Sequence, residues 1–454
     1  MQLSLDRPYY ARLLKIAVPI AVQNGINSLL QTLDVLMIGQ LGATAVAAAS
    51  LANQVAFLLT FFMYGITSGA AAFSAQFWGK EDLASIRKVL GICLLLCFSI
   101  AALFTALAEF FPAAALGLYT QDSAVIAQGI TYLQIAGLSY LFSAISLSYS
   151  AVLKGMGLVR LPMAVSVTAL SLKAFLSYAL IFGHFGLPAL GLVGGAIGTL
   201  AARVLEFGLM LAAVYLTRSP LAARFGQLFQ ANRAFVKAYL IVAFPVVINE
   251  ILWSSGFSFY SAIYARISTA ALAAVNIATS IEALAFVLII AFSDAGGILT
   301  GNQIGAGRPD LAFRYARRSL IHATLLGLLT GGVILAISGV YPTLYQVTPE
   351  VRAQASSILV IMGLVFWLRG SNFTLVVGIL RAGGDTRFSA LIDTGAVWLV
   401  GIPMALAGVY LFHLPVWGVY LLVMADEITR YIITFRRFFS RRWIHHLAGI
   451  GTET

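Results

Sequence analysis

The chain has 454 residues, of which 60% are hydrophobic and only 10% carry charged side chains. A water-soluble globular protein carries about 25% charged residues, so this composition excludes that class. The formal net charge of +11 does not indicate nucleic acid as a partner, because the basic residues form small separate clusters between apolar segments. We therefore predict an integral membrane protein in contact with the lipid bilayer.

Apolar segments of the roughly 20 residues needed to cross a bilayer recur along the whole sequence. They are expected to be helices, because the backbone in hydrocarbon must form its hydrogen bonds within the segment. The first follows Arg7, Arg12 and Lys15 without a small-residue cleavage site, so we expect a span and not a signal peptide. The predicted spans are 13–38, 45–77, 89–110, 124–153, 161–183, 189–216, 234–265, 271–303, 314–340, 351–380, 387–411 and 417–437.

Lysine and arginine are distributed unevenly between the two sides of these spans. The chain ends and the loops on one side hold 22 of the 28, whereas the opposite loops hold only Arg266 and Arg352. Cytoplasmic loops carry the excess of basic residues in membrane proteins. We therefore predict a multi-pass protein of a bacterial inner membrane, with both termini in the cytoplasm.

The sequence repeats itself at a spacing of 226 residues. Pro19 aligns with Pro245, and further matches pair Gly79 with Gly305, Tyr119 with Tyr345, Gln128 with Gln354 and Gly137 with Gly363. Six helices per repeat make the halves parallel, and such halves usually enclose a cavity between them. We expect an all-α fold of two six-helix bundles related by a pseudo-twofold axis, 1–216 and 238–454, joined by the loop 217–237. Each chain would have its own complete cavity, so a monomer is expected.

Polar residues form one stripe on the first predicted span and another on the seventh. Four positions at helical spacing make each stripe: Gln23, Asn27, Gln31 and Asp34 in the first, and Glu250, Ser254, Ser258 and Ser261 in the second. A charged side chain in mid-bilayer costs about 2.5–3.5 kcal/mol, so the stripes should face the protein interior or water. They are candidates for lining the cavity; the alternative is hydrogen bonding between helices.

Lys173 lies inside the fifth span without an acid nearby on its own helix. A buried lysine without a partner would lose its proton, so a carboxylate partner is expected. Asp34 is the best candidate in the same half, and a pair that opens when Asp34 is protonated could couple transport to a cation. A static pair with another group, or a lysine that reaches water at the membrane surface, are the alternatives.

The other intramembrane charges are interpreted more simply. Arg203 with Glu206 and Glu427 with Arg430 are three residues apart, which predicts local ion pairs. Four more lie in the second half and are expected to line its cavity or to form a network there: Glu282, Asp294, Arg369 and Asp393.

No catalytic or metal-binding pattern is found in the sequence. Cys93 and Cys97 share one face of an apolar helix and are expected to be packing residues. There is no phosphate-binding loop, no set of histidines with metal-ligand spacing, and no nucleophile with its base. We expect no enzyme, no cofactor and no bound metal, and an ion gradient as the source of energy.

Three motifs resemble the multidrug and toxic compound extrusion (MATE) family. Pro19 is followed by Asp34 and Ile38-Gly39, the eighth span ends in GNQIGAG (301–307), and LRAGGDT (380–386) follows the tenth. The resemblance covers about residues 10–440. It implies export of organic cations or other amphipathic compounds in exchange for H⁺ or Na⁺, with Asp34 as the cation-coupling residue.

Departures from the family patterns refine this interpretation. Members with a Na⁺ site in the first half carry Asn and Asp where this chain has Lys173 and Ser177, so H⁺ is favoured over Na⁺. The norfloxacin-exporting branch carries a glutamate where this chain has Trp253, and its tenth-helix aspartate is missing near Asn372. The chain thus resembles the DinF-like branch more closely, and Glu250 and Asn372 are kept as cavity candidates.

Other functions were weighed against export. A flippase for lipids or lipid-linked oligosaccharides shares the parent superfamily, but its cavity tends to be strongly basic, unlike one that holds Asp34 and a single lysine. A channel would need a ring of carbonyls or charges along its pore, and none is evident.

Overall fold

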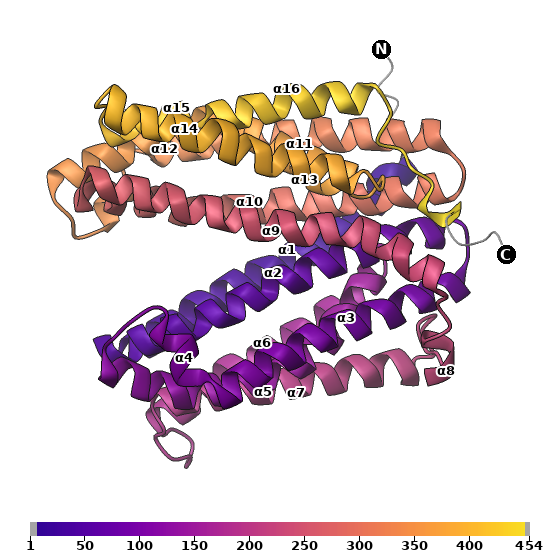
Figure 1. Ribbon diagram of the computed structural model, residues 1–454, viewed down its shortest axis with the longest axis horizontal. Helices are drawn as coiled ribbons and strands as arrows, with labels where there is room; N and C mark the ends of the chain where they lie inside the picture. Colours follow the sequence, from indigo (N-terminus) through magenta and orange to yellow (C-terminus); the bar gives the residue numbers. More distant parts are fainter. Residues whose placement is uncertain (1–6, 450–454) are drawn as a thin grey trace. The chain divides into compact units, whose positions relative to one another are not determined.

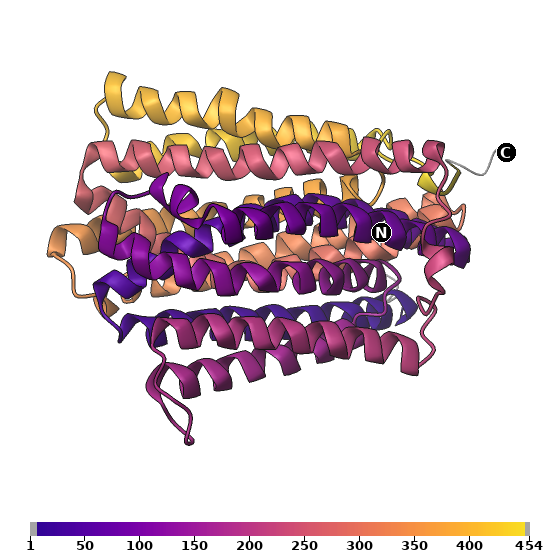
Figure 2. The same ribbon diagram turned by 60° about the horizontal axis from the view of Figure 1, so that its bottom comes forward.

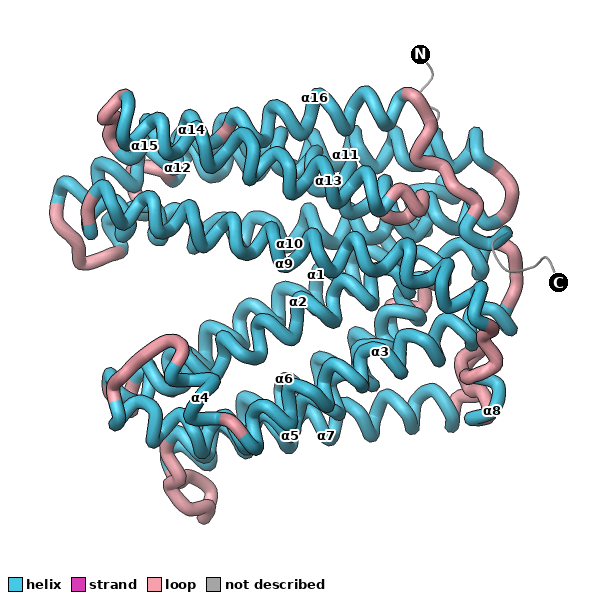
Figure 3. The backbone as a smooth tube through the Cα atoms, viewed as in Figure 1, coloured by secondary structure: helices cyan, strands magenta, loops and turns pink. Residues whose placement is uncertain are grey.

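The computed structural model describes residues 7–449, and within them every regular element is helical (Figure 3). This outcome has a simple physical cause. A long apolar segment in lipid finds no water to bond its backbone, so it bonds to itself as a helix. The predicted all-α class is confirmed.

Eleven helical segments within the described residues are long and apolar enough to cross a bilayer. They are α1 (Arg7–Gly39), α2 (Ala43–Gly79), α3 (Leu83–Phe110), α5 (Ser123–Gly155), α6 (Arg160–Phe182), α7 (Leu192–Leu216), α9 (Arg233–Ile267), α10 (Thr269–Gly305), α11 (Pro309–Ile337), α12 (Pro349–Phe373) with η2 (Thr374–Leu380), and α13 (Thr386–Ala396) with η3 (Val397–Gly401), α14 (Ile402–Leu406) and η4 (Ala407–Leu411).

The twelfth predicted span, 417–437, falls on two helices, α15 (Val416–Val423) and α16 (Ala425–Phe439). A turn at Met424 separates them, yet they follow one another along one line (Figure 1). The connections contain the short helices α4 (Pro112–Gly117), α8 (Phe225–Leu228), η1 (Tyr341–Leu344) and η5 (Leu447–Gly449).

Side-chain caps fix where several helices begin. Asp82 accepts a hydrogen bond from the backbone N–H of Ser85 at the start of α3, and Asp122 accepts one from Ala124 at the start of α5. Ser268 caps α10 in the same way. Each cap satisfies a backbone donor that the first helical turn leaves without a partner.

Residues Val22–Val247 form one compact unit, called here the N-terminal unit, whose helices lie alongside one another (Figure 2). Small residues allow its backbones to approach closely. A Cβ on Gly155 would strike the backbone of Ala71, and one on Gly65 would strike Val247. Such close approach replaces the hydrophobic driving force that is lost in lipid.

Residues Ile248–Thr454 form the C-terminal unit together with Met1–Ala21. A core of buried apolar side chains from α9, α10, α12 and α15 fills it, and Gly297 of α10 packs directly on the backbone of Gly378 in η2. At its edge, the Tyr9 hydroxyl of α1 lies 3.0 Å from that of Ser319 on α11. Three π-helical stretches, η2, η3 and η4, interrupt its helices between residues 374 and 411.

Two long helices are therefore divided between the units, α1 after Ala21 and α9 after Val247. The repeat-based division into 1–216 and 238–454 places these boundaries in loops, and it stays a prediction. The chain ends, 1–6 and 450–454, lie outside the described residues. Their predicted cytoplasmic location therefore stays a prediction.

Candidate functional site

The most prominent polar contact of the N-terminal unit joins two helices far apart in sequence. Lys173 of α6 donates a hydrogen bond from its ammonium to the carboxylate of Asp34 on α1. The two side chains are 22% and 19% exposed, so the pair is shielded but not sealed. The structure thus brings together the two residues that the sequence singled out as a pair.

One neighbour of this pair, Tyr132, was not identified from the sequence. The Tyr132 hydroxyl bonds to Asn53 and lies close enough to Asp34 to interact with its charge. On α6, Ser177 is buried, and a Cβ on Gly198 would strike it. The position that carries aspartate in Na⁺-site members is therefore packed tightly against α7.

The remaining residues of the first stripe differ in exposure. Gln23 is buried with its side-chain carbonyl unbonded among the described residues, Asn27 is half-buried, and Gln31 is exposed. In the seventh-span stripe Ser254 is half-buried, whereas the Ser258 and Ser261 hydroxyls are exposed and bond back to their own helix. These two serines bond within their own helix, which is neither of the two roles predicted for the stripe.

Glu250 lies on α9 and forms an ion pair in the C-terminal unit. Its Oε1 accepts a hydrogen bond of 2.9 Å from Arg381, which is itself buried in the turn after η2. Arg381 belongs to the LRAGGDT motif, so this motif supplies a counter-charge as well as a turn. Trp253 stands where the norfloxacin-exporting branch carries a glutamate. Its ring packs against Phe257, with the ring centroids 4.2 Å apart.

A network of buried charges occupies the middle of the C-terminal unit, and Arg369 of α12 is its first centre. Its guanidinium lies 2.6 Å from Glu282 of α10 and 3.4 Å from Glu427 of α16. Asn372, one turn after Arg369, donates to Glu427 Oε2 at 2.7 Å. The predicted local pair of Glu427 with Arg430 is present as well, at 3.4 Å.

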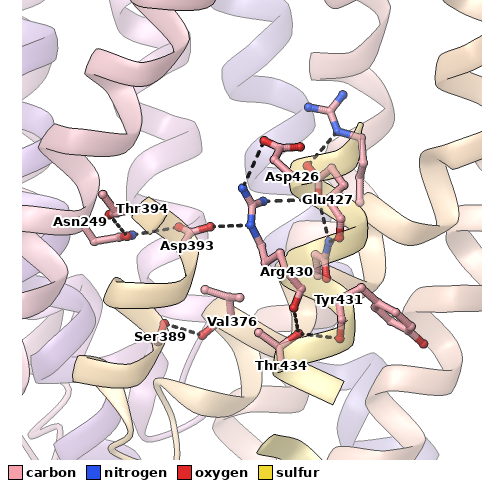
Figure 4. Close-up of polar contacts among 12 residues, drawn as sticks. Asn249, Val376, Ser389, Asp393, Thr394, Asp426, Glu427, Arg430, Tyr431 and Thr434 are labelled. Carbon is pink, nitrogen blue, oxygen red and sulfur yellow. Dashed lines mark hydrogen bonds and ion pairs between the residues drawn. The ribbon is translucent and has the colours of Figure 1, made fainter. Parts of the chain in front are cut away.

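Arg430 of α16 is the second centre of this network (Figure 4). Its guanidinium reaches Asp393 of α13 at 3.2 Å and Asp426 at 3.8 Å. Asp393 also accepts a 3.0 Å hydrogen bond from Asn249, and Asp426 one of 3.1 Å from the Tyr260 hydroxyl. The network therefore joins α9, α10, α12, α13 and α16. Three of the four second-half candidates, Glu282, Arg369 and Asp393, belong to it.

Asp294, the fourth candidate, is half-buried on α10 and has a polar interaction of its own. Asp426, Asn249 and Tyr260 were missed from the sequence. Asp426 directly precedes Glu427, and the predicted local pair of Glu427 with Arg430 leaves Asp426 without a role. Two adjacent acids against one arginine inside a span were the signal that could have revealed the wider network.

Elsewhere the polar groups are simple. Arg203 and Glu206 form the predicted local pair at 2.5 Å. Cys93 and Cys97 are free, buried thiols. No group of three or more potential metal ligands occurs within residues 7–449.

The helices and buried charges define a multi-pass membrane protein of the kind that moves solutes, and the comparisons give its family. The MatE family model matches residues 19–179 and again 245–407, one match within each predicted half. The chain belongs to the MATE family.

Its curated relatives include a probable multidrug resistance protein NorM of Rhizobium meliloti, 31% identical over 82% of this chain and 80% of the relative. The uncharacterized transporter YisQ of Bacillus subtilis is 26% identical over 94% and 93%, and the multidrug resistance protein PmpM of Pseudomonas aeruginosa 26% over 86% and 82%.

Solved structures share the fold. A MOP-superfamily transporter from Pyrococcus furiosus superposes with a TM-score of 0.86 at 16% identity, covering 97% of this chain and 96% of that one. An outward-facing multidrug resistance MATE transporter matches with a TM-score of 0.86 at 17% identity and the same coverage. These matches confirm the predicted fold class of two pseudo-symmetric six-helix bundles.

Proposed function

We propose that the protein is a secondary antiporter that exports organic cations or other amphipathic compounds in exchange for H⁺. The Asp34–Lys173 pair carries this proposal, because it is a shielded ion pair between two helices that a single proton can open. The printed names of several relatives, among them NorM and PmpM, describe multidrug resistance proteins, which supports the substrate class.

The pair suggests how a proton and a substrate exclude each other. With the cavity open to the exterior, Asp34 takes up a proton, releases Lys173 and allows the polar part of α1 to rearrange, so that the substrate leaves. With the cavity open to the cytoplasm, Asp34 loses the proton, and its restored charge favours a cationic substrate. Coupling needs only that the two ligands favour different states by about 1–3 kcal/mol.

H⁺ is favoured over Na⁺ by the groups around Asp34. The Lys173 ammonium occupies the space next to the carboxylate where a sodium ion would bind, and Ser177 is packed against Gly198 with no ionised oxygen to offer. Together with Trp253 in place of a glutamate, this supports a placement nearer the DinF-like branch of the family.

The wider cellular arrangement is part of the same proposal. The excess of basic residues on one side supports an inner-membrane protein of a bacterium with both ends cytoplasmic. The repeats support halves 1–216 and 238–454 that alternate the exposure of a single cavity, and a monomer as the working form.

Efflux from proteoliposomes tests the proposal, with ethidium as the organic cation and a pH gradient or a Na⁺ gradient imposed separately. Asp34→Asn should lower pH-driven efflux about tenfold or more. Glu206→Gln is the matched control, since it removes another shielded carboxylate of the same unit, and should leave efflux near wild type. Efflux that requires Na⁺, or that survives Asp34→Asn, would reject the coupling mechanism. If neither gradient moves an organic cation, transfer of a labelled lipid between leaflets becomes the function to test.

A further inference from the structure

The charge network of the C-terminal unit contains more acids than bases. Four carboxylates, Glu282, Asp393, Asp426 and Glu427, share two guanidiniums, Arg369 and Arg430. All six side chains are at most 15% exposed. Two excess negative charges in such surroundings are strongly unfavourable, so a buried group of this kind takes up a proton or a counter-ion.

Asp426 is the least compensated of the four acids. Its Oδ2 lies 3.8 Å from Arg430 and accepts a hydrogen bond from Tyr260, while its buried Oδ1 has no hydrogen-bond partner within the described part of the chain. By contrast, both oxygens of Asp393 are engaged, one by Arg430 at 3.2 Å and the other by Asn249 at 3.0 Å.

Other buried groups in the network also have polar atoms without a hydrogen-bond partner among residues 7–449. They include the side-chain carbonyl of Asn372, whose amide is bonded to Glu427, and the hydroxyl of Tyr420, which is 95% buried and close to Glu282, Arg369 and Asp426. Guanidinium nitrogens of Arg369 and Arg430 are among them as well, although both guanidiniums lie within ion-pair distance of the carboxylates. Independently of the acid count, hydrogen bonding in this part of the unit is therefore incomplete.

Whatever balances the excess of acids must be small and must tolerate nearby positive charge. An organic cation does not fit among side chains this deeply buried, and a metal cation would be repelled by guanidiniums within 3.2–3.8 Å of the same carboxylates. A proton meets both conditions. It needs no space, and on Asp426 it removes a negative charge that Arg430, 3.8 Å away, compensates only weakly.

The ionisable groups in and around the network come from several helices, and none of them replaces this proton. They are Tyr260 and Tyr264 of α9, Glu282 of α10, Arg369 of α12, Asp393 of α13, Tyr420 of α15, and Glu427 and Arg430 of α16. The two arginines are the cations of this set, and both are already shared among the other carboxylates.

We propose that Asp426 is a proton-binding residue of the C-terminal unit, separate from Asp34, and that it is protonated in the conformation described here. The protonation of Asp426 is inferred without reference to the proposed transport function. If that function holds, the transporter has two carboxylates able to bind protons, one in each unit.

A deformable element lies directly against this carboxylate. Gly401 ends the π-helical stretch η3, and a Cβ there would strike the Tyr260 hydroxyl and the Asp426 side chain. π-helical turns are common at functional sites and can return to α-helical geometry. A shift of η3 would therefore change the hydrogen bond between Tyr260 and Asp426, and with it the affinity of Asp426 for its proton.

Infrared spectroscopy of the full-length protein in lipid tests the proposal without any transport. At neutral pH we expect a carbonyl-stretch band of a buried protonated carboxylic acid in the wild type and in Asp34→Asn, and its loss in Asp426→Asn. Glu206→Gln, which changes a shielded acid outside the network, is the control and should keep the band.

Each other outcome counts against the proposal. A wild type without the band at neutral pH, a band that persists in Asp426→Asn, or a band lost in Asp34→Asn would overturn it. Since asparagine resembles the neutral acid, Asp426→Asn should also melt within a degree or two of the wild type. If it does not fold, Asp426→Glu must shift the band, and an unchanged band would overturn the proposal equally. Efflux that survives Asp34→Asn would reject the transport mechanism but leave this test valid.

Discussion

The Asp34–Lys173 pair makes a quantitative prediction about stability. Removing one partner of a buried ion pair costs about 3–5 kcal/mol, because a charge is left uncompensated. Here about a fifth of each side chain is exposed, so we expect about 2–3 kcal/mol for Asp34→Asn or for Lys173→Met alone. Replacing both residues removes both charges together, and the double variant should lie within about 1 kcal/mol of the wild type.

A double-mutant cycle measures this difference from unfolding in mixed micelles at neutral pH. The losses of stability in the two single variants would sum to about 4–6 kcal/mol, whereas the double variant should lose no more than about 1 kcal/mol. The interaction free energy between the two residues should therefore be at least about 2 kcal/mol. The local pair of Arg203 with Glu206 is the control, with an expected coupling of about 0.2–0.5 kcal/mol. Additive losses for Asp34 and Lys173 would refute the claim that they form one electrostatic unit.

Two further predictions concern the C-terminal unit. Gly297→Ala should destabilise the protein by about 1–3 kcal/mol, because the added Cβ would push α10 away from Gly378. Gly332→Ala is the control, since its Cβ meets open space, and it should be neutral or stabilising by about 0.5–1 kcal/mol. Equal melting temperatures for the two variants would contradict this packing. Burial raises the pKa of Asp385, but His445, whose Nε2 lies 3.6 Å from Oδ1, and two hydrogen bonds from Arg437 of 2.7 and 3.1 Å outweigh it and hold the pKa below its ordinary value. These contacts therefore stabilise the fold above about pH 4 and are lost as the pH falls through the lowered pKa, so Asp385→Asn should cost about 1.5–3 kcal/mol at neutral pH and progressively less in acid. A loss that does not depend on pH, measured by thermal melting, would contradict the assigned charge.

The fold was predictable because a bilayer leaves few choices. Length and apolarity located eleven of the twelve predicted spans as long apolar helices, while the twelfth falls on α15 and α16. The matches between Pro19 and Pro245 and between Gly79 and Gly305 indicated the repeat. The π-helical stretches were not predictable, since an apolar run such as Val397–Gly401 has the same appearance in either helical form. The break at Met424 carries no proline or glycine that would have marked it.

The candidate site was predictable where a buried charge would be too costly without a partner of opposite charge. A lysine in mid-membrane requires a carboxylate, and this reasoning pointed from Lys173 to Asp34, although their role in coupling stays a prediction. It did not reveal the interhelical partners of Arg430, because Glu427 on the same helix already offers a carboxylate at ion-pair spacing. Which distant acid completes a network depends on how helices pack, and no local spacing in α16 encodes Asp393.

The division of α1 and α9 between the two units has a consequence for biogenesis. The N-terminal unit needs residues up to Val247, so it can be completed while synthesis continues. The first helical turns, up to Ala21, belong with residues after Ile248 and must wait in the membrane for most of the chain to be made. Two fragments cut in the loop between the repeats would each lack a segment that the other holds. They should therefore reconstitute a stable protein only when produced together.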